Sequence, residues 1–491
     1  MRASRRRTAF LRLVPVAVSL LVLAAAGALA IQASAPPGPT AAPLPTSTLP
    51  PSGSDDLFVS PLGSDQATGG SSEPLRTIQA AVDRAGPGTT IWLAAGDYDG
   101  FAASTSGTDG RPITIAAMPG GTATIDPGSR DSTIDLSGAH DITLIGLTVE
   151  GPTGPARSAI HMERSARIVV SDSSIANTRG GFGIEVRHSA HVTITGNDIA
   201  HNAVGIRLYG EDDPGSVADI LIEHNAIHDS DSMIVNDAAP DNDFGANGII
   251  WHKVTGPTIA RDNQVWSNRA ASQDYGTDGG AFEIWGSSNM QITGNVAWDN
   301  VNVVETGSDG TPCSNISFTR NTAFVTTRGV GLILRCASDS LFANNVLHDV
   351  REYAFELSDR SGGNQFADSI AGLRIVNNIV VGTRLYVIRT ELPDSVTLDY
   401  NLVWQTGGSF AQVSGHGTIS SLEEFVRVTG YETHGLAEDP RFVDEATRDF
   451  RIGPGSPALD RGTPTGSGEP YTGTAPDIGR YEGVTALPSG S

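Results

Sequence analysis

Short strands in which apolar and polar residues alternate recur along most of the chain, and many of them are joined by a single asparagine. Segments such as HVTITGNDIAHN, NMQITGNVAWDN and VTLDYNLVWQT each contain a β-branched run, an asparagine and a second short run. A period of two predicts strands with one buried face. The spacing of the asparagines, 23 to 38 residues, is typical of a solenoid with inserted loops. The aligned positions are Asn197, Asn225, Asn263, Asn295, Asn321, Asn345, Asn378 and Asn401.

The shared asparagine has a structural interpretation. Asparagine tolerates the left-handed turn between two strands, and stacked side-chain amides can hydrogen-bond from one coil to the next. We therefore expect a ladder of asparagines inside a solenoid. A helix from about Thr77 to Ala85 precedes the coils and is expected to cap the open end. The predicted fold class is all-β, a right-handed parallel β-helix with an N-terminal capping helix.

The two ends of the chain predict export and a tethered domain. Residues 1–35 have a basic start, an apolar run and A-x-A positions, which predicts a signal peptide; an uncleaved membrane anchor is the alternative. Residues 36–56 hold seven prolines and form a predicted stiff linker. Residues 57–483 form the predicted β-helix domain with its cap and closing segment, and 484–491 a disordered tail. We expect a secreted or cell-surface protein with no stable membrane span after signal cleavage.

The chain is acidic, with 32 lysines plus arginines against 55 aspartates plus glutamates and a formal net charge of −23. Removal of the arginine-rich signal would make the mature protein more negative still. This balance argues against nucleic acid or an anionic membrane as a partner. We expect a monomer, and an anionic substrate would need a local arginine cluster or a bridging cation.

Both ends of the predicted domain resemble a known group of proteins. The stretch from DDLFVSPLGSDQ to IWLAAGDYDG resembles the opening of exported β-helix proteins of the pectate-lyase superfamily, and EDPRFVDEATRDFRIGPGSPALDRG resembles their closing segment. The resemblance covers nearly all of the predicted mature chain and implies the fold. It leaves the reaction open, because this fold hosts lyases, hydrolases, epimerases and non-catalytic proteins.

A second column of strands precedes the asparagine column, in segments such as GIRLYGE, GIIWHKV and AFEIWGS. Alternation directs one set of side chains outward, and coils stacked about 4.8 Å apart would align these side chains in rows. Charged residues on such a face can simply pair across coils. The aromatic residues among them favour a saccharide groove instead, since their rings stack on sugars. The expected substrate-binding residues are Arg207, Tyr209, Trp285 and Glu356.

The same face carries the candidate catalytic residues His252, Lys253, Glu283, Glu305 and Arg335. Lys253 is the only lysine of the chain, and it or His252 could take the proton that β-elimination of a uronate-containing polysaccharide requires. Arg335, Arg207 or a bound calcium ion would neutralise the sugar carboxylate. A polysaccharide lyase is the preferred function. A glycoside hydrolase with paired carboxylates and a non-catalytic polysaccharide-binding or surface protein are the alternatives.

Two insertions rich in aspartate and glycine, 229–247 and 269–281, flank the strand of Lys253 and offer the oxygen ligands that calcium takes. NGIIWHKVTG resembles the Asn-Gly-Phe-Lys strand of the calcium-dependent pectate lyases of polysaccharide lyase family nine, in which a lysine is the base. QDYGTDGG is distantly similar to their Asp-Asp-Gly calcium loop, although here the acidic loop follows the lysine. We expect Ca²⁺ as a cofactor, with turn formation as the alternative role of its candidate ligands Asp243, Asp274 and Asp278.

The two cysteines test the alignment of the coils. Cys313 lies eight residues before Asn321, and Cys336 lies nine residues before Asn345. One coil of separation therefore places the two cysteines almost directly above one another, within the roughly 4.4 to 6.8 Å between Cα atoms that a disulfide needs. We expect them to be joined in an exported protein, the alternative being two separate buried thiols.

Overall fold

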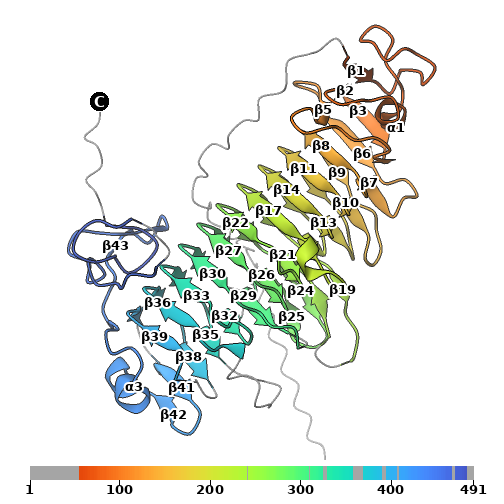
Figure 1. Cartoon of the computed structure of the whole chain (residues 1–491). Coiled ribbons are helices and arrows are strands. Elements are labelled where there is room, and N and C mark those ends of the chain that lie inside the picture. The colour runs from red at the N-terminus through yellow and green to blue at the C-terminus, as the bar shows by residue number, and fades with distance from the viewer. Residues whose placement is uncertain are drawn as a thin grey trace, which may run out of the picture. The chain divides into compact units, whose positions relative to one another are not determined.

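The computed structural model describes residues 55–239, 242–308, 310–324, 329–357, 369–389, 394–405, 408–466 and 470–483. The predicted signal peptide, the linker up to residue 54 and the predicted tail lie outside these residues and stay predictions. The described coils succeed one another in chain order from the N-terminal end to the C-terminal end (Figure 1). No helix among the described residues is long and apolar enough to cross a membrane.

Away from the two ends of the solenoid, each coil contributes one strand to each of three long sheets, so that neighbours in a sheet are one coil apart in sequence. The first sheet has 13 strands and contains the strand before each ladder asparagine. In spatial order these are β1 (Leu57–Val59), β2 (Thr90–Leu93), β5 (Ile113–Ala117), β8 (His140–Ile145), β11 (Ala166–Ser171), β14 (Ala190–Thr195), β17 (Ala218–Glu223), β22 (Thr258–Arg261), β27 (Met290–Thr293), β30 (Ile316–Thr319), β33 (Leu341–Ala343), β36 (Arg374–Val376) and β39 (Thr397–Asp399).

The second sheet also has 13 strands and carries the predicted site column. Its strands pair in parallel until β42 turns back antiparallel at the last coil. They are β4 (Phe101–Ala102), β7 (Ser132–Asp135), β10 (Ser158–Glu163), β13 (Phe182–Arg187), β16 (Val204–Tyr209), β21 (Asn247–His252), β26 (Gly280–Trp285), β29 (Asn302–Gly307), β32 (Val330–Leu334), β35 (Tyr353–Leu357), β38 (Leu385–Arg389), β41 (Ala411–Val413) and β42 (Gly417–Ile419).

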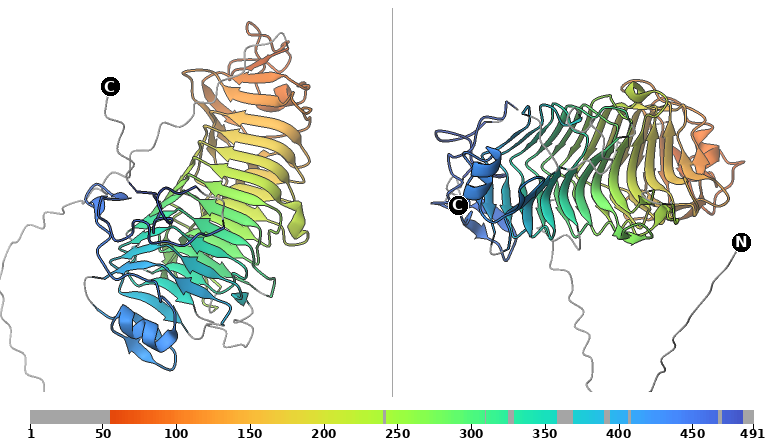
Figure 2. Two further views of the ribbon diagram at one scale, coloured as in Figure 1. Left: turned by 60° about the vertical axis from the view of Figure 1, so that its left-hand side comes forward. Right: turned by 90° about the horizontal axis from the view of Figure 1, so that it is seen from below.

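The third sheet has 12 parallel strands, each of which follows a ladder position. The stacked arrows of successive coils are visible in both views of Figure 2. The strands are β3 (Gly96–Asp99), β6 (Ala123–Asp126), β9 (Thr148–Glu150), β12 (Ser174–Ala176), β15 (Asp198–Ala200), β18 (Ala226–His228), β23 (Gln264–Trp266), β28 (Val296–Trp298), β31 (Thr322–Phe324), β34 (Val346–His348), β37 (Ile379–Val381) and β40 (Leu402–Trp404).

Short hairpins and helices lie outside the three long sheets. Two hairpins interrupt the coils next to the second sheet, and a third belongs to the closing segment. The helices are brief, and α1 lies over the first coils, as predicted for a cap, although it is shorter than expected. The elements are β19 (Met233–Val235) with β20 (Phe244–Gly245), β24 (Ala270–Ser272) with β25 (Gly276–Asp278), β43 (Phe442–Asp444) with β44 (Asp449–Ile452), α1 (Ile78–Val82), the 3₁₀ helix η1 (Pro214–Ser216) and α3 (Leu422–Thr429).

The asparagine ladder is present as predicted. In each step the side-chain oxygen of one asparagine accepts both the backbone N–H and the side-chain N–H of the asparagine one coil earlier; for Asn225 and Asn263 both distances are 3.0 Å. The last step ends on a carboxylate, since Asn401 donates to Glu432 through its backbone (3.1 Å) and its side chain (2.7 Å). The ladder therefore satisfies buried polar groups at the same corner of successive coils.

The expected reason for asparagine at this corner is wrong in one respect. The left-handed conformation belongs to the residue before each ladder asparagine, such as His224 (φ 55°) and Asp262 (φ 54°), and not to the asparagine itself. The preceding residue makes the turn and points outward, which leaves the asparagine free to direct its amide into the coil. Asparagine is required here for its hydrogen bonds and not for its turn propensity.

The register of the second sheet fixes which side chains face outward. Glu283 on β26 lies opposite Glu305 on β29, and Trp285 lies opposite Gly307. Ile284, between the two outward residues of β26, is buried in the core. Both carboxylates are partly exposed, so the predicted outward register of this column is correct.

Candidate functional site

A groove lies on the outer face of the second sheet, across five neighbouring coils from β21 to β35. It encloses a cavity of about 230 Å³, and the β19–β20 and β24–β25 hairpins contribute one wall. Its polar and aromatic lining residues are Asp243, Asn247, Tyr275, Thr277, Asp278, Glu283, Trp285, Asn302, Glu305, Arg335, Glu352 and Glu356. The structure thus brings together most of the predicted site residues.

Glu283 lies at the centre of this groove. Asn247, one coil earlier, donates its side-chain N–H to the Glu283 carboxyl at 2.6 Å. Burial raises the pKa of Glu283 to about 8, and the negative charges of Glu305 and Asp278 act in the same direction. The carboxyl opens to the groove but is densely surrounded by protein on its other sides. Glu283 is therefore protonated at neutral pH and can donate a proton.

Glu305, on the next coil, has a different environment. Arg335 lies 2.8 Å from the Glu305 carboxylate through one guanidinium nitrogen and 3.6 Å from Glu356 through the other. An arginine stays protonated in practice, so Arg335 forms ion pairs with both carboxylates. Glu356 is 4% exposed and lies beneath the guanidinium. The groove therefore presents one protonated and one ion-paired carboxyl group on adjacent coils.

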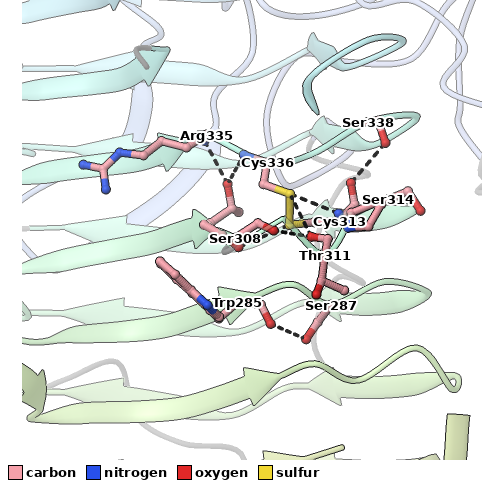
Figure 3. Close-up of a disulfide and its surroundings, with 12 residues drawn as sticks. Trp285, Ser287, Ser308, Thr311, Cys313, Ser314, Arg335, Cys336 and Ser338 are labelled. Carbon is pink, nitrogen blue, oxygen red and sulfur yellow. Dashed lines mark hydrogen bonds between the residues drawn. A yellow bond between two sulfur atoms is a disulfide. The ribbon is translucent and has the colours of Figure 1, made fainter. Parts of the chain in front are cut away.

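The predicted disulfide supports the position of Arg335. Cys313 and Cys336 are bonded, with their Cα atoms 5.3 Å apart, as the coil alignment predicted. The Thr306 hydroxyl accepts the backbone N–H of Arg335 (3.0 Å) and of Cys336 (3.2 Å). Figure 3 shows the bond beside the coil ends from which Arg335 and Trp285 project. The guanidinium thus extends from a backbone that is held by a covalent link and by two hydrogen bonds.

Trp285 lines the groove beside Glu283, as predicted. Its indole lies against the backbone of the next coil, where a Cβ atom on Gly307 would come within 2.3 Å of the Trp285 ring. Glycine at this position is therefore a requirement of the close approach. A partly exposed indole held flat over a coil suits stacking against a sugar ring.

His252 and Lys253 are not among the groove-lining residues. The ammonium of Lys253 lies 3.1 Å from Glu211, and the ring of His252 lies 3.9 Å from the same carboxylate. Tyr209, one coil earlier, also hydrogen-bonds to Glu211, and its ring centre is 5.1 Å from that of His252. Alternation placed Tyr209 and His252 on the outer face of the sheet. No sequence pattern indicated that Glu211, in the loop after β16, would contact Tyr209, His252 and Lys253.

Arg207 is packed between a carboxylate and aromatic rings. Its guanidinium lies 3.3 Å from Glu185, 4.7 Å from the centre of the Phe182 ring and 4.0 Å from that of Tyr209. The arginine side chain is only 13% exposed and does not line the groove. Nearby Ile250, at an outward position of β21, is buried under the β19–β20 insertion in a small outer hydrophobic cluster.

The two acidic insertions, 229–247 and 269–281, are joined by hydrogen bonds. The backbone N–H of Asp274 donates to the Asp243 carboxylate (3.0 Å), and the N–H of Asp243 donates to the Asp274 carboxylate (3.2 Å). The Ser272 hydroxyl adds a 2.6 Å bond to Asp243. Within the described ranges, no group of three or more histidines, cysteines, aspartates or glutamates is arranged to hold a metal ion. These contacts fit the turn-forming alternative, and Ca²⁺ stays a prediction.

Sequence reasoning missed five polar groove residues, which are Asn247, Tyr275, Thr277, Asn302 and Glu352. Asn247 begins β21 and lies opposite Gly280, which lies opposite Asn302. This row of Asn, Gly and Asn was present in the sequence but was hidden, because only the asparagines between the first and third sheets repeat regularly. Tyr275 lies in a hairpin whose fold over the sheet no local pattern indicates.

One family model and several known proteins match this chain. A family model described as "Pel9A-like, right handed beta helix region" matches residues 57–324, which include Glu283 and Glu305 but not Arg335. The uncharacterized protein YwoF of Bacillus subtilis is 25% identical over 445 residues, covering 82% of this chain and 92% of YwoF. Pectate lyase PEL9 of Emericella nidulans is 38% identical over 90 residues, or 16% of this chain and 22% of PEL9.

Among solved structures, pectate lyase Pel9A matches 87% of this chain and 96% of its own length, with 17% identity and a TM-score of 0.48. The PL6 family alginate lyase AlyGC matches 79% of this chain and 60% of its own, with 14% identity and a TM-score of 0.45. The matching family model describes a right-handed β-helix, so the predicted fold class is confirmed.

Proposed function

Because the chain belongs to the family with a Pel9A-like right-handed β-helix region, we propose that it is a carbohydrate-active enzyme that cleaves glycosidic bonds of a polysaccharide outside the cell. We propose hydrolysis as the reaction. One observation carries this proposal: Glu283 and Glu305 lie opposite each other on adjacent coils of one groove, where burial raises the pKa of Glu283 and Arg335 forms an ion pair with Glu305. Two such carboxyl groups are the machinery of glycoside hydrolysis.

In the proposed reaction, Glu283 gives its proton to the leaving glycosidic oxygen while the Glu305 carboxylate attacks the anomeric carbon. Adjacent strands of the sheet are about 4.8 Å apart, which suits the roughly 5 to 5.5 Å between the carboxyl groups of retaining enzymes. The product of this step is a covalent glycosyl ester on Glu305. We therefore propose retention of the anomeric configuration.

The second half of the reaction follows from the coupling between the two groups. The negative charge of Glu305 contributes to the raised pKa of Glu283. Once Glu305 is esterified it carries no charge, so the pKa of Glu283 falls and its carboxylate can act as a base. Glu283 then takes a proton from water, the water oxygen bonds to the anomeric carbon, and Glu305 leaves as a carboxylate. Both residues return to their starting protonation states.

The remaining residues would bind and orient the polysaccharide. Trp285 offers a ring face beside the reacting carboxyls, and Tyr275 lines the groove from the hairpin. In the sheet, His252 lies opposite Trp285 on one side and opposite Tyr209 on the other. The three rings therefore form a row that runs from Trp285 towards the N-terminal coils. We propose that this row binds sugar units away from the cleavage point.

Elimination remains a second candidate, favoured by the 38% identity to the fungal pectate lyase PEL9 over 90 residues. It would need a base for the sugar C5 proton and a group to neutralise the uronate. Lys253 is held by Glu211 outside the groove lining, so for this reaction the base would have to come from another residue or from movement of this strand.

A product assay separates the candidates. Residues 55–483 would be incubated with a panel of polysaccharides, with and without a calcium chelator. Hydrolysis yields new reducing ends without ultraviolet-absorbing unsaturated sugars, whereas elimination yields both. We expect reducing ends alone, and about a 10²- to 10⁴-fold loss of rate in Glu283→Gln. Glu438→Gln, at an exposed position, is the control. Unsaturated products would reject hydrolysis, and binding without new reducing ends would favour the non-catalytic alternative.

A further inference from the structure

The groove is lined by an excess of acidic side chains. Six carboxyl groups line it, and among its described lining residues Arg335 is the one cationic side chain. That guanidinium is already in contact with Glu305 and Glu356. Glu283 is protonated at neutral pH and adds no charge. The other five acidic residues outnumber the single guanidinium, so the charge presented to an incoming sugar is negative; they are Asp243, Asp278, Glu305, Glu352 and Glu356.

This arrangement matches some sugars and opposes others. Ionised carboxylates are acceptors only, so they complement hydroxyl and ammonium groups, which donate. A uronate carboxylate has no proton to donate and would be placed among like charges, which is strongly unfavourable in a confined groove. The uncharged donors of the lining belong to Asn247, Tyr275, Thr277, Trp285 and Asn302. They can bind sugar hydroxyl groups but cannot neutralise a carboxylate, and the Asn247 amide already donates one N–H to Glu283.

We propose that the subsite between Glu283 and Glu305 accepts a sugar without negative charge, either neutral or amino-substituted, and rejects uronate, sulfated and phosphorylated sugars. The inference rests on the proposed function only in taking this groove as the substrate site. It names a substrate class different from the uronate polymer that the sequence suggested. Selection comes from the lining as a whole, because each carboxylate contributes to the field at the subsite.

Glu283→Gln is the suitable protein for a binding test. Since Glu283 is protonated at neutral pH, glutamine keeps both the shape and the charge of the groove while removing the proton donor. Its binding would be measured by calorimetry at pH 7 against oligosaccharides matched in linkage, namely β-1,4-glucan, β-1,4-glucuronan and β-1,4-glucosamine. We expect the uronate oligomer to bind at least about tenfold more weakly than either of the others.

A charge reversal tests the cause. Glu352 lines the groove, so Glu352→Lys is expected to reduce the discrimination against uronates, whereas Glu438→Lys, outside the groove, should leave it unchanged. Tighter binding of a uronate oligomer than of its neutral partner, with or without added calcium, overturns the inference. Selective binding of neutral sugars by a wild-type protein that cleaves none of them would overturn the proposed hydrolysis and leave this inference standing. Hydrolysis of uronate polymers in preference to neutral ones by the wild-type protein, without unsaturated products, would overturn this inference and leave the proposed hydrolysis standing.

Discussion

Replacing Glu283, the proposed proton donor, by glutamine should stabilise the protein relative to wild type, and this stability difference should grow as the pH rises. The pKa of Glu283 is raised from 4.5 to about 8 in the folded protein, chiefly by burial. Below pH 4.5 the carboxyl group is protonated in both the folded and the unfolded chain. Between pH 4.5 and 8 only the unfolded chain releases the proton, so the wild-type free energy of unfolding falls across this window. Glu283→Gln cannot ionise and does not suffer this loss.

The magnitude follows from the size of the shift. Each pKa unit corresponds to about 1.4 kcal/mol, so a shift of this size sets a ceiling of about 5 kcal/mol. Glu283 opens to the groove, where water screens part of the charge, and we therefore expect about 2 to 3 kcal/mol. Glutamine can still accept the hydrogen bond that Asn247 donates to Glu283, so its packing cost should be small. A stabilising substitution that abolishes activity is typical of a strained catalytic group.

Urea denaturation of wild type and Glu283→Gln at about pH 5 and about pH 8.5 measures the effect. The stability gain of the variant should be about 2 to 3 kcal/mol larger at the higher pH. Glu438→Gln is the matched control, and it should change the free energy of unfolding by less than about 0.5 kcal/mol. An equal gain at both pH values, or a loss at pH 8.5, would refute both the burial of this carboxyl group and its assignment as the proton donor.

Three further predictions concern the ladder, the row of outer subsites and the disulfide. Asn295→Ala leaves the donors of Asn263 unpaired and should lower the free energy of unfolding by about 3 to 5 kcal/mol, whereas Gln291→Ala, exposed on the same coil, should change it little; similar values would reject the ladder as a stabilising element. Tyr209→Ala should raise KM several-fold for long oligosaccharides but not for the shortest ones cleaved; an equal rise for both would reject outer subsites. Cys336→Ser should cost about 3 kcal/mol in denaturation and lower kcat through Arg335, and a stable variant with unchanged kcat would contradict both effects.

The sequence by itself determined the length of each coil and which residues of adjacent coils lie opposite each other. Apolar alternation set the inward and outward faces, and the repeating asparagine set the coil length, so the pairing of Glu283 with Glu305 and of Cys313 with Cys336 could be predicted by counting. The physical reason is that a solenoid is nearly one-dimensional. Each coil contacts only its neighbours, and local periodicity therefore carries the tertiary register with it.

Only the tertiary structure decided where on that face the groove lies. The insertions before β21 and β26 fold back over the sheet, bury Ile250 and form a wall of the groove with Tyr275 and Asp278. Lys253 forms an ion pair with Glu211 outside the groove lining. Loop conformation depends on contacts between residues far apart in sequence, which no period encodes.

The protonation of Glu283 was likewise beyond the sequence. Its raised pKa comes from burial together with the charges of Glu305 and Asp278, and these three residues are contributed by two coils and a hairpin. A carboxyl group has the same appearance in a sequence whether it lies on an open sheet or at the bottom of a groove. Its charge state follows from how much water and how much opposing charge the folded chain leaves around it, and that is decided only when the coils stack and the hairpins close over them.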